Sequence, residues 1–161
     1  MTAGAMSRLS HLDAEGRARM VDVTDKAVTA REAVAEGYVR MAAETRELAL
    51  AGTGKKGEVI ATAELAGVMA AKRTADLIPL CHPLALSSIR VAVEPSEHGL
   101  RVMARVKTTA QTGVEMEALT AVSVACLTLF DMLKAADKAM TIEGVRVLEK
   151  SGGRSGSWSA E

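Results

Sequence analysis

Aromatic residues are scarce in this chain, whose 161 residues include one Trp, one Tyr and one Phe. A protein that binds nucleic acid by stacking bases on aromatic rings needs more of them. Lys plus Arg equals Asp plus Glu at 20 each, so the formal net charge is zero. A neutral chain has no general electrostatic attraction for nucleic acid or for an anionic membrane surface. We therefore expect neither nucleic acid nor a membrane as a partner.

Cysteine is also rare. Cys81 and Cys126 are the only two, and they stand in apolar surroundings without CxxC spacing. This pattern argues against a disulfide scaffold and a zinc site, and it suits a reducing compartment. The N-terminus lacks the basic and apolar segments of a signal peptide, and no apolar run looks long enough to span a membrane. A cytoplasmic protein is expected.

Hydrophobic residues are plentiful, at 48% against 25% charged residues, so the chain can bury a core built from Ala, Val, Leu, Ile and Met. Its length indicates one domain. We expect a flexible N-terminus over residues 1–10, a single catalytic domain over 11–150 and a flexible Gly/Ser-rich tail over 151–161.

Residues 111–138 organise the chain. Apolar residues recur there at three- and four-residue spacing, and no charge occurs from Ala118 to Phe130, which predicts a helix buried on most sides. Its charges lie at the ends, Glu115 and Glu117 at the start and Asp131 and Lys134 near the finish. Fourteen residues of helix span about 21 Å. Either the two ends serve different sites, or one site lies between subunits.

Asp131 and Lys134 share a face of this helix, because they are three residues apart. A surface ion pair of small energetic value is the plain alternative to a catalytic role.

Two further helices are predicted upstream. Thr29 and Glu32 fit a capping box, and the apolar spacing that follows predicts a helix ending near 51–52. A second helix is expected over 58–75, with Lys72 and Arg73 at its end either complementing the helix dipole or binding an anion. The loop 53–57 between them contains Lys56 beside Gly57 but lacks P-loop spacing.

Residues 77–84 form a stiff loop, because Pro79 and Pro83 bracket Leu80, Cys81 and His82 and exclude a helix. A lone histidine is usually structural. Its presentation between two prolines makes a role in a site equally plausible here.

Alternating apolar residues predict a hairpin from strands 87–94 and 100–107, and a bulged strand or strand pair over 140–148 interrupted at Gly144. Residues 20–23 are a candidate short strand or extended segment in front. This order predicts an α+β fold, a ferredoxin-like sandwich with an antiparallel sheet covered on one face by helices.

The candidate chemistry therefore lies in Cys81 and His82, in Glu115 to Glu117, and in Asp131 with Lys134. Positive charge comes from Lys56, Lys72, Arg73 and Lys150. Such a set suits proton transfer on an anionic, phosphorylated small molecule.

Long motifs in a fixed order give a family resemblance. The chain resembles the cyclic pyranopterin monophosphate synthase family of molybdenum cofactor biosynthesis over roughly residues 11–156. The runs that carry the resemblance are 20–23, 56–57, 71–74, 77–84, 112–121, 131–134 and 150–153.

The resemblance implies an enzyme that converts a cyclised GTP-derived nucleotide into cyclic pyranopterin monophosphate and releases pyrophosphate. It also implies a hexamer, a trimer of dimers, with sites between subunits. Its motifs place catalytic roles on Asp131, Lys134 and Lys56. They place substrate contacts on Leu80, Cys81, His82, Met116, Glu117, Lys150 and Asp22.

Gln111 departs from the pattern, since some relatives carry a basic residue there, and Lys107 is a candidate substitute for the missing phosphate contact. No carboxylate spacing specifies a metal, so no cofactor is expected, although Mg²⁺ accompanying the phosphates is compatible with the sequence. The alternative function, from a different class of protein, is that of a non-catalytic, self-assembling small-molecule binder.

Overall fold

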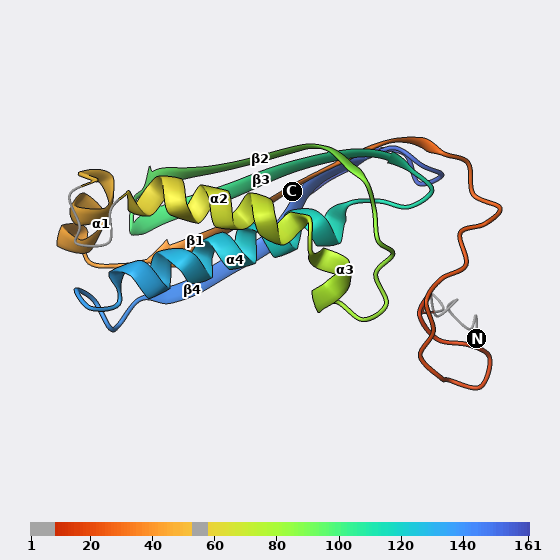
Figure 1. Cartoon of the computed structure of the whole chain (residues 1–161), viewed down its shortest axis with the longest axis horizontal. Coiled ribbons are helices and arrows are strands. Elements are labelled where there is room, and N and C mark those ends of the chain that lie inside the picture. Colours follow the sequence, from red (N-terminus) through yellow and green to blue (C-terminus); the bar gives the residue numbers. More distant parts are fainter. Residues whose placement is uncertain (1–8, 53–57) are drawn as a thin grey trace.

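The computed structural model describes residues 9–52 and 58–161, which form five strands and four helices (Figure 1). The strands are β1 (Thr29–Arg40), β2 (Leu86–Ser96), β3 (Gly99–Ala110), β4 (Thr141–Ser151) and β5 (Trp158–Ser159). The helices are α1 (Ala43–Leu50), α2 (Val59–Ala71), α3 (Thr74–Leu77) and α4 (Glu115–Leu133).

All strand pairs are antiparallel, and the sheet order is β2-β3-β1-β4-β5. Helices connect β1 to β2 and β3 to β4, and α2 and α4 cover one face of the sheet (Figure 1). This arrangement of the four long strands is the split βαβ, or ferredoxin-like, topology. The predicted α+β fold is confirmed.

The helix predicted over residues 29–51 is wrong, because its first half is the central strand β1. β1 pairs with β3 on one side and with β4 on the other. Ala33, Ala35 and Val39 are fully buried at a spacing of two residues, which is the period of a strand rather than a helix. Only the eight residues of α1 are helical, and residues 20–23 form no strand.

The other predicted elements are present. Helix α2 with the short α3, the hairpin β2–β3, helix α4 and strand β4 lie where the sequence patterns placed them. β4 is a single bulged strand: the register shifts between the pairs Glu36–Arg146 and Tyr38–Glu143, at Gly144.

The core lies between the sheet and the helices and consists mainly of Ala, Val and Leu. Small residues let these layers approach closely. A Cβ atom on Gly67 of α2 would lie 2.9 Å from the carbonyl oxygen of Ala121 in α4, so glycine sets the spacing of the two helices. By length and composition α4 is apolar enough to cross a membrane, contrary to expectation, but half of that stretch is buried inside this fold.

No helix of the described residues covers the opposite face of the sheet, and charged residues occupy it. Glu36 is only 3% exposed, and its carboxylate accepts hydrogen bonds from Arg101 (2.8 Å), Arg146 (2.9 Å) and the Tyr38 hydroxyl (3.2 Å). Burial alone would raise the pKa of Glu36, but the bonds from Arg146 and Arg101 outweigh it and hold the pKa below its usual value. The face is therefore ordered by ion pairs rather than by apolar packing.

The C-terminal segment returns to the sheet. In β5, Trp158 pairs with Lys150 and Ser159 with Glu149 of β4. The tail expected over 151–161 thus contains one short strand.

Candidate active site

The first turn of α4 places three predicted site residues at one end of the molecule. Glu117 is 4% exposed. Burial, together with the nearby negative charge of Glu115, raises the pKa of Glu117 to about 6. Met116 points outward and is partly exposed. This end of α4 therefore offers a sheltered acid that exchanges its proton near neutral pH, the range that general acid–base catalysis requires.

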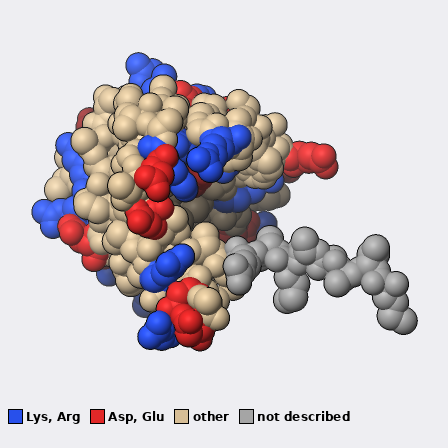
Figure 2. Space-filling model, turned by 90° about the vertical axis from the view of Figure 1, so that its right-hand side faces the viewer, with Lys and Arg blue, Asp and Glu red and all other residues tan. Residues whose placement is uncertain are grey.

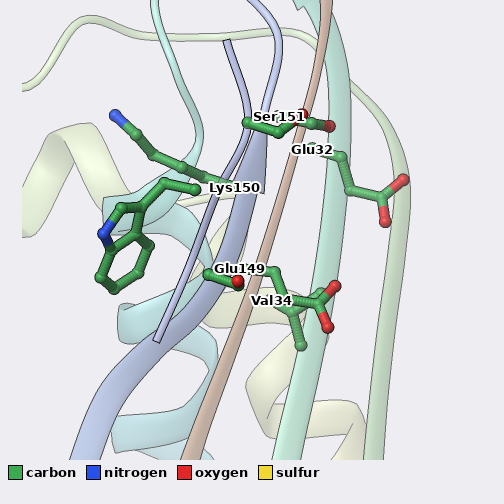
Figure 3. Close-up of a pocket in the computed structure, with 8 residues that line it drawn as sticks. Glu32, Val34, Glu149, Lys150 and Ser151 are labelled. Atoms are coloured by element: carbon green, nitrogen blue, oxygen red, sulfur yellow. The ribbon is translucent and has the colours of Figure 1, made fainter. Parts of the chain in front are cut away.

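Lys150 joins this end from the sheet. Its ammonium lies 3.1 Å from the Glu115 carboxylate. Lys150 pairs with Ala33 of β1, and Figure 3 shows it extending to the opposite side of β4 from Glu32 and Glu149. Figure 3 draws the residues that line a cavity of about 250 Å³, and they come from β1, β4 and β5 and the residue before β5.

The proline-bracketed loop lies beside the same end. Burial raises the thiol pKa of Cys81, and the nearby negative charge of Glu117 raises it further. Cys81 is therefore a neutral thiol rather than a nucleophilic thiolate. Leu80 is half-buried next to it.

His82 ties this loop to the N-terminal segment, since its Nε2 lies 2.7 Å from the Val21 carbonyl oxygen. Asp22 follows directly. Hydrogen bonds from the hydroxyl and the backbone N–H of Thr24 lower the pKa of Asp22, with smaller contributions from the charges of Arg19 and His82. Asp22 is therefore a carboxylate at neutral pH.

Lys72 and Arg73 follow α2 and are exposed. α2 and α4 run in opposite directions, so the C-terminal end of α2 lies toward the N-terminal end of α4 (Figure 1). Figure 2 looks onto this end of the molecule, where basic and acidic side chains surround a hollow.

Asp131 and Lys134 lie at the other end of α4. The Lys134 ammonium donates to the Asp131 carboxylate at 2.6 Å, and the side chains are 56% and 63% exposed, respectively. The contact expected from their spacing is present. Lys56, the third predicted catalytic residue, lies outside the described residues.

The structure thus separates the predicted site residues into two groups. Glu117 and Asp131 are 14 positions apart on one continuous helix, about 21 Å along its axis. One chain alone does not bring both groups to one small molecule.

At the first end, the sequence interpretation missed Arg31 and the contacts of Gln111, which it named only as a departure from the family pattern. The Gln111 amide donates to the carbonyl oxygens of Thr24 (3.2 Å) and Lys26 (3.1 Å), and Arg31 donates to the Gln111 carbonyl oxygen at 3.2 Å. Arg31 lies in the segment that the sequence interpretation took for a helix. The two-residue spacing of Ala33, Ala35, Gly37 and Val39 was the signal that pointed to a strand. Lys107, the candidate substitute for a basic residue at 111, pairs instead with Glu32 at 3.2 Å.

Within residues 9–52 and 58–161, no group of three or more His, Cys, Asp or Glu side chains is placed to hold a metal ion. Both cysteines are free thiols. The chemistry available from the described residues is therefore proton transfer and charge compensation.

Comparison with known proteins identifies the family of this chain. Residues 20–153 match the model of the MoaC family. A cyclic pyranopterin monophosphate synthase from Methylobacterium sp. (strain 4-46) is 63% identical over 158 residues, which are 97% of this chain and 99% of the relative. A protein of the same name from Methylobacterium nodulans is 62% identical with the same coverage. The match runs from Met20 in the N-terminal segment to Gly153 after β4, and the chain belongs to the MoaC family.

Proposed function

We propose that this chain catalyses the conversion of (8S)-3',8-cyclo-7,8-dihydroguanosine 5'-triphosphate into cyclic pyranopterin monophosphate and pyrophosphate. It would act as a phosphorus–oxygen lyase of molybdenum cofactor biosynthesis. The observation that carries the proposal is the identity of more than 60% over nearly the whole length to two proteins that bear the corresponding enzyme name.

The arrangement of acids and bases supports this chemistry. The purine-derived ring must open and the pterin ring must close, which requires protons to be given and taken. Asp131 and Lys134, in direct contact, are proposed as the catalytic acid–base pair together with Lys56. Attack of a sugar hydroxyl on the innermost phosphate then breaks its bond to the outer two phosphates, forms the cyclic phosphate and expels pyrophosphate.

The other end of α4 is proposed to hold the substrate. Leu80, Cys81 and His82 on the loop, Met116 and Glu117 on the helix, and Asp22 and Lys150 beside them line the approach. Glu115 orients Lys150 through their ion pair, and the exposed Lys72 and Arg73 add positive charge for the phosphates.

Since these two groups lie about 21 Å apart along α4, we propose that each active site combines the first end of one chain with the second end of another. A homohexamer built as a trimer of dimers would supply such sites. The enzyme is proposed to act in the cytoplasm, without nucleic acid or membrane as a partner and without a resident cofactor. Any Mg²⁺ would enter with the phosphates.

The direct test is to incubate the purified protein with the cyclised nucleotide and to measure pyrophosphate and the pterin product. Equimolar release of both is expected. Tight binding without pyrophosphate release would instead identify a non-catalytic binder and overturn the proposal.

Shared sites are tested by complementation. Lys134→Ala and His82→Ala subunits, each inactive alone, should regain activity when co-expressed, up to about a quarter of the wild-type rate for random pairing of two chains at each site. Co-expressed Lys134→Ala and Asp131→Asn subunits are the matched control, because both changes affect the same end of α4. Equal activity in the two mixtures would contradict sites shared between chains.

A further inference from the structure

The C-terminal segment holds the one tryptophan of the chain at a fixed place beside the sheet. Trp158 pairs with Lys150 of β4, and the backbone N–H of Ala160 donates to the Leu148 carbonyl oxygen at 2.7 Å. The turn before it depends on Gly152, which has a positive φ of 93°. The short strand β5 therefore has a defined register, and its register fixes the direction of the indole.

Trp158 projects from the face of the sheet that α4 covers. Directly opposite residues of an antiparallel pair project to the same face, so the indole follows Lys150. Lys150 in turn pairs with Ala33 of β1. Ala33 shares its face with Gly37, where a Cβ atom would lie 2.7 Å from the Val122 side chain of α4. The indole thus lies on the helix side of the sheet, at its β5 edge.

The neighbours of Trp158 belong to the site proposed above. The Cβ atoms of directly opposite residues are about 5 Å apart, which puts the indole next to Lys150. The Lys150 ammonium lies 3.1 Å from the carboxylate of Glu115 in the first turn of α4. Glu117, the buried acid of that site, is two positions further on. Trp158, Lys150 and Glu115 therefore form a row from the edge of the sheet to the helix.

Packing does not account for the position of Trp158. Its side chain is half-exposed, and within the described part of the chain its indole forms no hydrogen bond and no ring contact. Ser157 and Ser159 on either side are exposed as well, so β5 buries little apolar surface. A tryptophan held in this way presents a wide apolar face and one N–H donor, which suits a planar heterocycle.

Neither of the other two aromatic residues is placed for this role. Phe130 lies near the opposite end of α4 and packs against the core. The Tyr38 hydroxyl donates to Glu36 on the face of the sheet that α4 does not cover. Trp158 is therefore the one aromatic ring of the chain at the proposed substrate end.

We propose that Trp158 binds the ring system of the substrate, with the indole stacked on the purine-derived ring while Lys150 contacts the same molecule. The inference rests on the proposed function for the identity of the substrate. It adds a residue outside the range 20–153 that matches the family model. Stacking tolerates changes in the identity of the ring, so one indole can hold the ring before and after its rearrangement. Such uniform binding acts on KM rather than on kcat.

The kinetic test compares substitutions at position 158. Trp158→Ala should raise KM for the cyclised nucleotide roughly ten- to a hundredfold, as expected for the loss of one stacked base, with a much smaller change in kcat. Trp158→Phe keeps an aromatic face and should stay within about threefold of wild type. Trp158→Leu keeps apolar bulk without that face and should resemble Trp158→Ala.

Ser159→Ala is the matched control. Ser159 pairs with Glu149, which Figure 3 shows on the other side of β4 from Lys150. This variant changes the same strand on its opposite face, so both kinetic constants should remain at the wild-type values.

Binding is measured separately by calorimetry with GTP, which carries a purine ring, and with inorganic triphosphate, which has none. Trp158→Ala should weaken GTP binding by about tenfold or more and leave triphosphate binding unchanged. An equal loss for both ligands would show a general disturbance of the site and would overturn the stacking role.

The outcomes separate this inference from the proposed function. Absence of turnover in the wild-type protein, with GTP binding that Trp158→Ala weakens and Trp158→Phe retains, would overturn the proposed function and leave Trp158 as a ring-binding residue. Unchanged KM and GTP affinity in Trp158→Ala would overturn the inference even if turnover is normal. A Trp158→Ala protein with a different oligomeric mass would also overturn it, because the indole would then lie in a contact between subunits.

Discussion

The two ends of α4 carry the same kinds of side chain in opposite surroundings. At the N-terminal end, Glu117 is almost completely buried and its pKa is raised to about 6. At the C-terminal end, the Asp131–Lys134 pair is more than half exposed. The fold alone therefore sets the proton affinity of the first end, while the second end acquires a sheltered environment only when something else covers it.

Because of this difference, substitutions at the two ends should act differently on the stability of the fold and on catalysis. An exposed ion pair contributes about 0–1 kcal/mol to folding, so its removal should affect function far more than structure. A buried acid affects folding directly, because its protonation is coupled to the free energy of unfolding.

The largest expected effect comes from Lys134→Ala. Loss of a general acid–base group should lower kcat for pyrophosphate release by about 10²–10⁴-fold without a loss of folded structure. Lys138→Ala, an exposed lysine one turn further on, is the matched control and should retain activity. If the folded Lys134→Ala protein turned over substrate at close to the wild-type rate, Lys134 would not be a catalytic residue.

Glu117→Gln should change stability in a pH-dependent way. The pKa of Glu117 is raised from 4.5 to about 6 in the folded protein, so the native state binds the proton more tightly than the unfolded chain does. Wild-type stability is then highest below pH 4.5 and falls as the pH rises through 6, by about 2 kcal/mol in total.

Glutamine lacks this ionisation, so the variant should gain up to about 2 kcal/mol over wild type at pH 8 and nothing of this origin at pH 4. Chemical unfolding at the two pH values measures the difference. The same gain at pH 4 and at pH 8 would show that burial does not raise the pKa of Glu117.

Asp131→Asn should give the smallest change in stability. Its carboxylate and the ammonium of Lys134 are exposed, so the free energy of unfolding should change by less than about 1 kcal/mol while turnover is lost. A loss of several kcal/mol, measured by urea unfolding, would mean that this end is more sheltered than the comparison states.

Most of the fold follows from local patterns. The periodicity of residues 111–138, the alternation in 87–107 and the glycine at 144 correctly predicted α4, the hairpin and the bulged β4. β1 was missed because residues 33–37 are buried on both faces of a central strand, which weakens the polar–apolar alternation that marks a strand. Only the two-residue spacing of small and apolar residues from Ala33 to Val39 remained as a signal. The capping box, and the apolar residues that follow it at helical spacing, were given too much weight.

The site was predictable in parts. Spacing alone predicted the contact of Asp131 with Lys134 and the separation of the two ends of α4. The hydrogen bonds of Gln111 and His82 join segments 60 to 90 positions apart. No local pattern encodes such pairings, and none encodes the burial of Glu117. For the same reason, the sequence did not predict a cavity lined by residues around Arg31 and Arg154, because its walls come from two distant parts of the chain.

The single tryptophan of the chain lies on β5, opposite Lys150 in the sheet. Its side chain is 49% exposed, so its emission should respond to changes in the polarity around it. The intrinsic fluorescence of the unlabelled protein therefore originates at the end of the molecule where substrate is proposed to bind, and it offers a direct optical signal of occupancy in real time.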